Sequence, residues 1–152
     1  MNRSLNVNIY NGISEDTLVN IIKLDSLLLT QSWTLKMWKN ELRKDGSRAV
    51  LCYLDKVLVG FCLFSIGPLL ENCDLYKIAV LPAYHRRGFA SKILQHTTDY
   101  LSKAGVKWLF LDVECHNFSA INMYKSLNFQ ALNRRESYYT NGSGSFLMGL
   151  EI

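Results

Sequence analysis

The sequence of 152 residues lacks an unbroken apolar run long enough to cross a membrane. Its longest apolar stretch, residues 57–70 (VLVGFCLFSIGPLL), is interrupted by glycine, serine and proline. Residues 1–12 alternate polar and apolar positions and do not contain the continuous apolar segment of a secretory signal. These absences predict a cytosolic (cytoplasmic) protein without a membrane partner.

A paired cysteine motif is also missing. The four cysteines stand apart within apolar, strand-like stretches and form no C-x-x-C pair; they are Cys52, Cys62, Cys73 and Cys115. Disulfides and metal ligation remain open readings of such residues, but isolated cysteines in apolar runs are typical of buried free thiols. We therefore expect free thiols and no metal site.

Charge is sparse and only weakly biased: charged residues make up 20% of the chain and the net charge is +4. The basic residues do not form a stripe but occur as isolated pairs: Arg43/Lys44, Arg86/Arg87 and Arg134/Arg135. Stacking aromatics interleave with them only at Tyr138/Tyr139, so no direct nucleic-acid role is expected. With 49% hydrophobic residues and no repeat or linker, residues 1–152 predict one globular domain.

What is present is a mixed pattern of strands and helices. Alternating or continuous apolar runs predict strands at residues 5–10, 48–55, 57–66, 74–82, 106–115, 128–139 and 145–152. Helical spacing and capping residues predict helices at residues 14–29, 32–44, 88–104 and 119–127. We expect an α/β (α+β) domain, with about four helices on a mixed, largely antiparallel sheet of six to seven strands.

Three local details of this pattern can be checked. Asp55-Lys56 is expected to turn a hairpin although it lacks the usual glycine. In the second helix, Trp33, Met37 and Leu42 fall near one face. The strand at 106–115 has a continuous apolar centre, which is typical of burial on both faces.

Residues 84–91 (YHRRGFAS) stand between a predicted strand and a predicted helix. The first N–H groups of a helix lack internal partners, Gly88 permits a positive φ, and Arg86 and Arg87 add positive charge. These features fit a phosphate site, and they fit equally a surface turn with solvated arginines. Because the stretch lacks G-K-[ST] and the three glycines of the dinucleotide fingerprint, neither of those nucleotide sites is expected.

Residues 78–94 (IAVLPAYHRRGFASKIL) resemble the acyl-CoA-binding segment of the GCN5-related N-acetyltransferase (GNAT) superfamily, whose pattern is Gln/Arg-x-x-Gly-x-Gly/Ala. His85 stands where the pattern has glutamine or arginine, whereas Gly88 and Ala90 fit. The resemblance implies the GNAT fold, acetyl-CoA as co-substrate and no metal. It also implies that the coenzyme A pyrophosphate is bound by the backbone amides of Arg86, Arg87, Gly88, Phe89, Ala90 and Ser91, and that the pantetheine arm lies along Ile78, Ala79 and Val80.

Residues 111–129 (LDVECHNFSAINMYKSLNF) resemble the family's next block. The match implies that Asn117 contacts the coenzyme A arm, and that Tyr124 lies beside the sulfur as the catalytic acid. Read from the residues alone, Asn117 also fits a helix N-cap and Tyr124 also fits plain packing on an apolar helix face.

The base is less clearly matched. Asp112 stands where the family has a glutamate and is one methylene shorter, so a water relay is one way to span the gap. Glu114 is the alternative, because period-2 geometry puts it on the same strand face. Both acids also fit a solvated strand end. The resemblance further implies that a backbone N–H near Val80 meets the oxyanion.

The outer segments resemble the ribosomal-protein-alanine N-acetyltransferase (RimI-like) subgroup: residues 31–38 (QSWTLKMW) and 134–152 (RRESYYTNGSGSFLMGLEI). Tyr138 and Tyr139 match its substrate-side aromatic pair, although cross-strand packing is an alternative role. The implied function is acetylation of a protein N-terminus, that of ribosomal protein S18. Two alternatives stay open, namely a lysine or small-amine acetyltransferase and a catalytically weak acyl-CoA-binding regulatory module.

Overall fold

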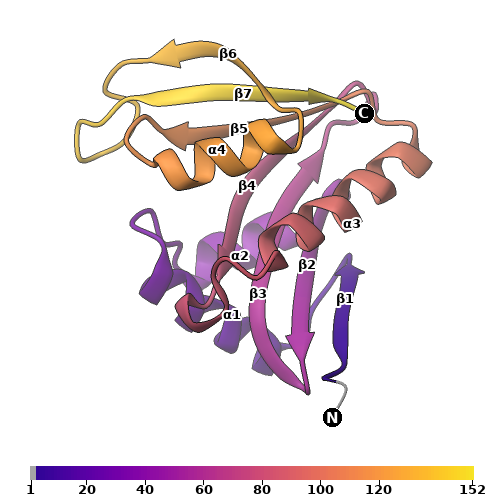
Figure 1. Ribbon diagram of the computed structural model, residues 1–152. Helices are drawn as coiled ribbons and strands as arrows, with labels where there is room; N and C mark the ends of the chain where they lie inside the picture. Colours follow the sequence, from indigo (N-terminus) through magenta and orange to yellow (C-terminus); the bar gives the residue numbers. More distant parts are fainter. Residues whose placement is uncertain (1–2) are drawn as a thin grey trace.

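The computed structural model describes residues 3–152. Within this part of the chain one sheet of seven strands has the order β1-β2-β3-β4-β5-β7-β6 (Figure 1). Every neighbouring pair in it is antiparallel except β4 and β5, which confirms the expected mixed, largely antiparallel sheet. The strand bounds are β1 (Leu5–Tyr10), β2 (Ser47–Leu54), β3 (Val57–Ile66), β4 (Asn72–Val80), β5 (Trp108–Glu114), β6 (Gln130–Arg135) and β7 (Ser145–Glu151).

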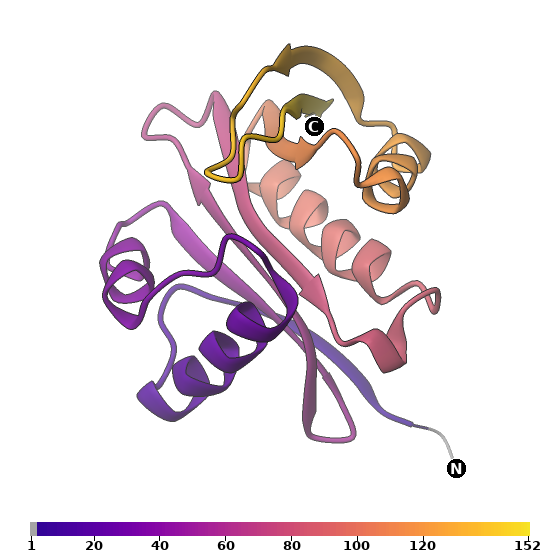
Figure 2. The ribbon, with the colours of Figure 1, turned by 90° about the vertical axis from the view of Figure 1, so that its left-hand side faces the viewer.

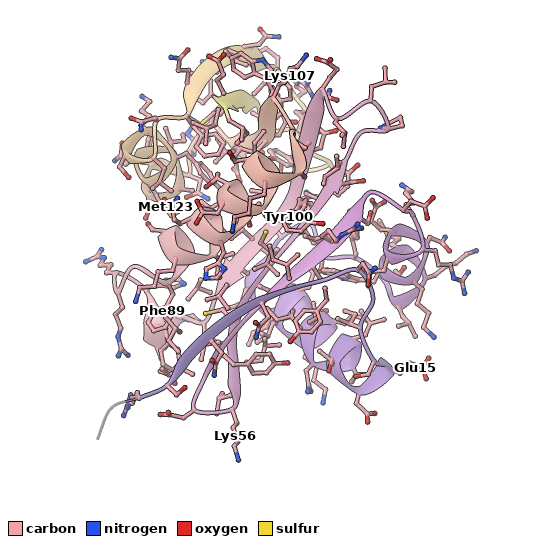
Figure 3. The ribbon with its side chains drawn as sticks, turned by 90° about the vertical axis from the view of Figure 1, so that its right-hand side faces the viewer. Glu15, Lys56, Phe89, Tyr100, Lys107 and Met123 are labelled. Atoms are coloured by element: carbon pink, nitrogen blue, oxygen red, sulfur yellow. The ribbon has the colours of Figure 1, made fainter. Side chains whose placement is uncertain are left out.

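Helices cover both faces of the sheet. Figure 2 shows α1 and α2 on one face and α3 and α4 on the other. Figure 3 looks onto α3, with Phe89 and Met123 on its side of the sheet and Glu15 across the sheet. The helix bounds are α1 (Glu15–Leu28), α2 (Leu35–Leu42), α3 (Phe89–Ala104) and α4 (Phe118–Ser126), with a short 3-10 helix, η1 (Pro82–Tyr84).

Local patterns account for most of these elements. Ser14 caps α1 by accepting a hydrogen bond from the Thr17 N–H, and Gly105 ends α3 with a φ of 81°. The hairpin between β2 and β3 turns at Asp55-Lys56, as predicted, with φ values of 48° and 68°. Positive φ at both positions gives the turn the twist that a two-residue hairpin requires, even without glycine.

The prediction for the second helix holds for Trp33 and Leu42, which pack against the core, but it is wrong for Met37. Trp33 precedes α2, whose N-cap is Thr34, and Met37 is 46% exposed. The buried residues of α2 are Trp38 and Glu41, and Trp38 packs edge-on against Phe61 of β3 with ring centroids 5.7 Å apart. The eight residues of α2 form about two turns, so the direction from which it meets the sheet decides which side chain is buried.

Two strand predictions also need correction. β5 is not buried on both faces: Leu109, Leu111 and Val113 are buried, but the residues that alternate with them are half-exposed. The half-exposed face is the one on the side of α1 and α2, which lie over β4 and β2 instead. The strand expected at 128–139 ends at Arg135, since Ser137 has a φ of 49° and turns the chain. Tyr138 and Tyr139 therefore lie in the β6–β7 loop.

The central feature for the site is the separation of β4 from β5. Their parallel pairing covers only residues 72–75 against 108–111. Beyond that point β4 stays paired with β3 and β5 with β7, so the two halves of the sheet diverge (Figure 1). Tyr76 has no partner in the β3–β4 register, which is a β-bulge at the point of divergence.

Candidate active site

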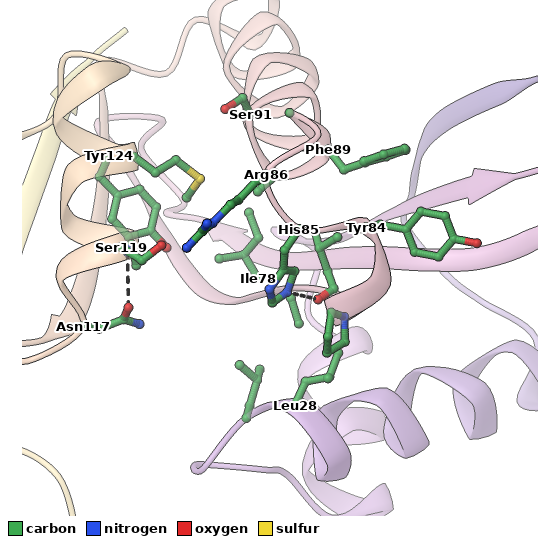
Figure 4. Close-up of a pocket in the computed structure, with 18 of the residues that line it drawn as sticks. Leu28, Ile78, Tyr84, His85, Arg86, Phe89, Ser91, Asn117, Ser119 and Tyr124 are labelled. Carbon is green, nitrogen blue, oxygen red and sulfur yellow. Dashed lines mark hydrogen bonds between the residues drawn. The ribbon is translucent and has the colours of Figure 1, made fainter.

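The divergence of β4 and β5 opens a cleft of about 740 Å³, bounded by the end of α1, β4, the loop before α3, and α4 (Figure 4). The residues predicted to bind the cofactor line this cleft, with the exception of Arg87: they are Ile78, Ala79, Val80, Arg86, Gly88, Phe89, Ala90, Ser91 and Asn117. The structure therefore brings two separate sequence blocks to one site.

The loop before α3 presents backbone amides to the cleft. Gly88 is the N-cap of α3 with a φ of 76°, and no side chain caps the helix. The first helical hydrogen bond runs from Lys92 N–H to the Gly88 carbonyl, so the amides of residues 89–91 have no acceptor inside the helix. Arg86 also has a positive φ, 57°, which is uncommon for a residue with a side chain. A helix N-terminus with free amides and an arginine at its rim is suited to a phosphate group.

His85, the residue that departs from the family pattern, anchors this loop to the sheet. Its Nε2 lies 2.6 Å from the carbonyl oxygen of Val80, at the end of β4 (Figure 4). The two arginines that follow separate: Arg86 lines the cleft, but the guanidinium of Arg87 lies over the rings of Tyr84 and Phe89, at 5.3 and 5.5 Å from their centroids. The Arg87 side chain therefore does not line the cleft.

The edge of β4 supplies further donors. Leu81 donates its N–H to the Val59 carbonyl of β3 at 2.8 Å. Since neighbouring residues of a strand direct their backbone groups to opposite edges, the N–H groups of Val80 and Ile78 point away from β3. They face the cleft, because β5 has already diverged.

Tyr124 of α4 lies where this cleft meets a second, smaller cavity, and it lines both. Its side chain is only 5% exposed, and burial raises the pKa of its phenol well above the usual value. Among residues 3–152 its hydroxyl has no hydrogen-bond partner, yet no fully buried polar side-chain atom of these residues is left unpaired. The hydroxyl is thus open to the cavities.

Asn117 both caps α4 and lies at the cleft. Its Oδ1 accepts a hydrogen bond from the Ala120 N–H at 3.2 Å, which confirms an N-cap for α4. Its side chain also lines both cavities, so its amide NH₂ group is placed to donate to a ligand.

The second cavity has a volume of about 180 Å³ and lies between β4, β5 and the loop that joins α1 to α2. It contains both candidate bases, but the two differ in their surroundings. Asp112 accepts a hydrogen bond from the Ser145 hydroxyl at 3.1 Å and pairs with Arg135 Nη1 at 3.3 Å, so both of its oxygens are engaged. The Glu114 carboxylate has no hydrogen-bond or ion-pair partner in the described chain. Of the two carboxylates, only that of Glu114 is without such a partner among residues 3–152.

The two tyrosines of the β6–β7 loop, Tyr138 and Tyr139, are in contact but differ in their position relative to the small cavity. Their rings meet edge to face, with centroids 5.0 Å apart. Tyr139 lines the small cavity, and burial raises its pKa to about 12. Tyr138 is 46% exposed and lies against Arg135, whose guanidinium is 5.2 Å from its ring centroid. Only Tyr139 reaches the cavity directly.

The sequence analysis missed a buried ion pair beside this cavity. Asp25 of α1 is fully buried and its Oδ1 lies 2.9 Å from the Nζ of Lys77, which is itself 5% exposed. Burial lowers the pKa of Lys77, and Asp25 opposes that shift. Two signals were available: an acidic residue in the last turn of a helix, where the dipole disfavours it, and a lysine inside an apolar strand.

The remaining features of the described chain are simple. All four cysteines are free and buried, as expected. No group of three or more His, Cys, Asp or Glu side chains within residues 3–152 is placed to hold a metal ion. None of the helices formed by these residues is long and apolar enough to cross a membrane.

Comparison with known proteins gives a consistent result. Residues 16–129 match the model of the acetyltransferase (GNAT) family. The [ribosomal protein bS18]-alanine N-acetyltransferase of Escherichia coli (strain K12) is 38% identical over 86 residues, which are 55% of this chain and 58% of that protein. The match thus spans less than two thirds of this relative.

Two further similarities extend over most of the chain. The N-alpha-acetyltransferase of Saccharolobus solfataricus is 26% identical over 144 residues, 88% of this chain and 86% of that protein. The crystal structure of the ribosomal-protein-S18-alanine N-acetyltransferase from Escherichia coli superposes with a TM-score of 0.84 at 26% identity, covering 96% of this chain and 94% of the other.

Proposed function

The chain belongs to the acetyltransferase (GNAT) family, and from this premise we propose that residues 1–152 form one domain that transfers the acetyl group of acetyl-CoA to a protein's N-terminal α-amino group. The observation that carries the proposal is the meeting of two cavities at Tyr124, one large and rich in backbone donors, the other small and acidic. The names of the relatives support an N-terminal acceptor, and we propose that of ribosomal protein S18. A ribosomal acceptor implies a cytosolic reaction.

The larger cleft offers the hydrogen-bond donors and the positive charge that coenzyme A requires. The free amides at the start of α3, with the Arg86 side chain, suit the pyrophosphate. The amides of Ile78 and Val80 suit the pantetheine arm and the acyl oxygen, and the NH₂ group of Asn117 lies across the cleft from them. In this proposal Arg87 contributes its backbone amide only, because its side chain is stacked on aromatic rings.

The smaller cavity fits a primary amine. Lys77 is paired with Asp25 and Arg135 with Asp112, so Glu114 is its one uncompensated charge among the described residues. A single negative charge favours the binding of an amine, and the carboxylate can accept the one proton that a neutral amine loses when it attacks. With about 180 Å³, the cavity has room for an amine carrying a small side chain. Tyr139 lines it, and Tyr138 lies at its exposed rim as a further contact for the peptide.

The proposed reaction is direct transfer. The neutral amine nitrogen attacks the thioester carbonyl carbon, a C–N bond forms, the C–S bond breaks, and the amine proton goes to Glu114. Negative charge on the acyl oxygen is met by a strand N–H near Val80. Tyr124, protonated at neutral pH, donates a hydrogen bond to the departing sulfur. Because its pKa lies above that of a thiol, near 8.5, full proton transfer is uphill, and the phenol acts mainly by stabilising the thiolate.

Replacing each of the two carboxylates by its amide, one at a time, distinguishes the candidate bases. We expect Glu114→Gln to lower kcat/KM by about tenfold, less than the usual effect of a general base because an α-amino group with a pKa of about 8 is already partly neutral. Asp112→Asn is expected to act through its ion pair with Arg135, raising the KM for the acceptor more than it lowers kcat. Steady-state kinetics at pH 7 measure both. A larger loss of kcat in Asp112→Asn would assign the base to Asp112.

The proposed acceptor is tested by release of free thiol from acetyl-CoA. We expect turnover with a hexapeptide that has the N-terminal sequence of S18, and none with the same peptide blocked by N-acetylation. Faster turnover of a peptide whose only amine is a lysine side chain would contradict an N-terminal acceptor. Binding of coenzyme A without acetylation of either peptide would favour the regulatory binding module.

A further inference from the structure

The Asp25–Lys77 pair has no part in the chemistry proposed above, although it is the most deeply buried ion pair in the described chain. Removing two charges from water costs free energy that their attraction only partly returns, so a buried pair is a poor device for stability alone. Its position therefore calls for a specific geometric role.

The pair binds the loop between α1 and α2 at two points. Lys77 Nζ donates to the backbone carbonyl of Gln31 at 2.6 Å, and Asp25 Oδ2 accepts from the backbone N–H of Trp33 at 2.9 Å. The ammonium also lies 4.8 Å from the centroid of the Trp33 ring. The Lys77 side chain, from the centre of the sheet, thus binds the backbone of the α1–α2 loop at its middle.

The same loop forms a wall of the small cavity. Leu29, Thr30 and Gln31 line it, together with Lys77. The side chain of Gln31 also donates to the Thr140 hydroxyl at 3.2 Å, which links this loop to the β6–β7 loop that carries Tyr139. A displacement at Gln31 would therefore move both walls against which an acceptor lies.

We propose that Lys77 is a positioning residue for the acceptor: by binding the Gln31 carbonyl and Asp25 at once, it sets the α1–α2 loop at the distance from β5 that the acceptor requires. The proposal rests on the proposed transfer to an amine in the small cavity. Lys77 touches neither reacting atom in this account and acts through the loop. The alternative is that Lys77 only neutralises the buried charge of Asp25.

A single and a double variant separate these roles. Lys77→Met leaves Asp25 unpaired, and it is expected to raise the acceptor KM by about tenfold, the effect of losing one charge-assisted hydrogen bond, with the acetyl-CoA KM within about twofold. The double variant Lys77→Met/Asp25→Asn removes both charges, while the new amide oxygen can still accept from Trp33 and Trp38. We expect it to regain most of the lost stability, because no unpaired charge remains, but to keep the raised acceptor KM.

A double variant with the wild-type acceptor KM would overturn the proposal, since neutralising Asp25 would then be sufficient. An acceptor KM unchanged in Lys77→Met would do the same. Lys107→Met is the matched control, because Lys107 is 63% exposed and pairs with Glu71 on the surface. It is expected to change neither KM.

Amide hydrogen exchange in the free protein tests the proposal without any acceptor. We expect residues 29–33 to exchange faster in Lys77→Met and in the double variant, with β4 and α3 unchanged. Unaltered exchange in this loop would refute the positioning role whatever the activity. Absence of acetylation by the wild-type protein, together with faster exchange in the variants, would instead contradict the proposed function and leave the loop contact supported.

Discussion

Replacing Tyr124 by phenylalanine is expected to lower kcat by about 10²-fold, while the dissociation constant for coenzyme A stays within about twofold. The phenol is the one hydroxyl of the described chain at the junction of the two cavities. Loss of a hydrogen bond to a developing charge removes stabilisation that exists only in the transition state, which lowers kcat and kcat/KM together. The ring that packs on Phe129, with centroids 5.5 Å apart, is retained.

The fold should tolerate this change, because the hydroxyl has no partner among residues 3–152 that would be left unpaired. Thiol release under saturating substrates measures kcat, and calorimetry measures the affinity for coenzyme A. Tyr100→Phe is the matched control. Tyr100 lies on α3, outside both cavities, and its hydroxyl accepts a hydrogen bond from Arg48 Nε at 3.1 Å. A wild-type rate in Tyr124→Phe would remove the tyrosine from the mechanism, and a lost affinity would show that it binds the cofactor instead.

Trp38→Ala should have the largest effect on stability, lowering the free energy of unfolding by about 3–5 kcal/mol. Trp38 is fully buried, contacts the rings of Trp33 and Phe61, and donates its Nε1–H to Asp25 Oδ2 at 2.8 Å. The truncation leaves a cavity and weakens the solvation of a buried carboxylate, and these two losses add.

Urea denaturation measures this loss. Met37→Ala is the matched comparison, because Met37 is the adjacent residue of α2 and is 46% exposed, so its loss should change the free energy of unfolding by less than about 0.5 kcal/mol. Equal destabilisation by the two substitutions would contradict the observed orientation of α2. Trp38→Phe should lie between them, since it keeps most of the buried ring and loses only the N–H donor.

Features that depend on neighbouring residues could be predicted from the sequence. The hairpin at Asp55-Lys56, the capping of α1 by Ser14 and of α4 by Asn117, and the glycine at the start of α3 each follow from backbone preferences over a few residues. The sequence block at residues 78–94 also indicated a phosphate-binding loop, because its amides are freed by the start of one helix.

The tertiary structure gives the candidate residues surroundings that the sequence did not show. Asp112 and Glu114 share a strand face, but Arg135 and Ser145, 23 and 33 residues after Asp112, engage only the first of them. His85 and Arg87 lie in one loop, yet their environments turn one toward Val80 and the other onto aromatic rings. Such differences arise from where the other elements pack, which short-range patterns do not encode.

The sequence by itself determined the succession of strands and helices along the chain, because that depends on periodicity. Its short motifs indicated the family, by resemblance, and the loop that begins α3, because the residues of each motif are close together in the chain. Only the tertiary structure showed the two cavities, the burial of Trp38 in place of Met37, and the pair formed by Asp25 and Lys77, 52 positions apart. The physical reason is the same in each case. The cavities, the burial of Trp38 and the Asp25–Lys77 pair all depend on the divergence of β4 from β5 and on the packing of α1 and α2 against the sheet. These features bring distant residues together and decide which charges are paired.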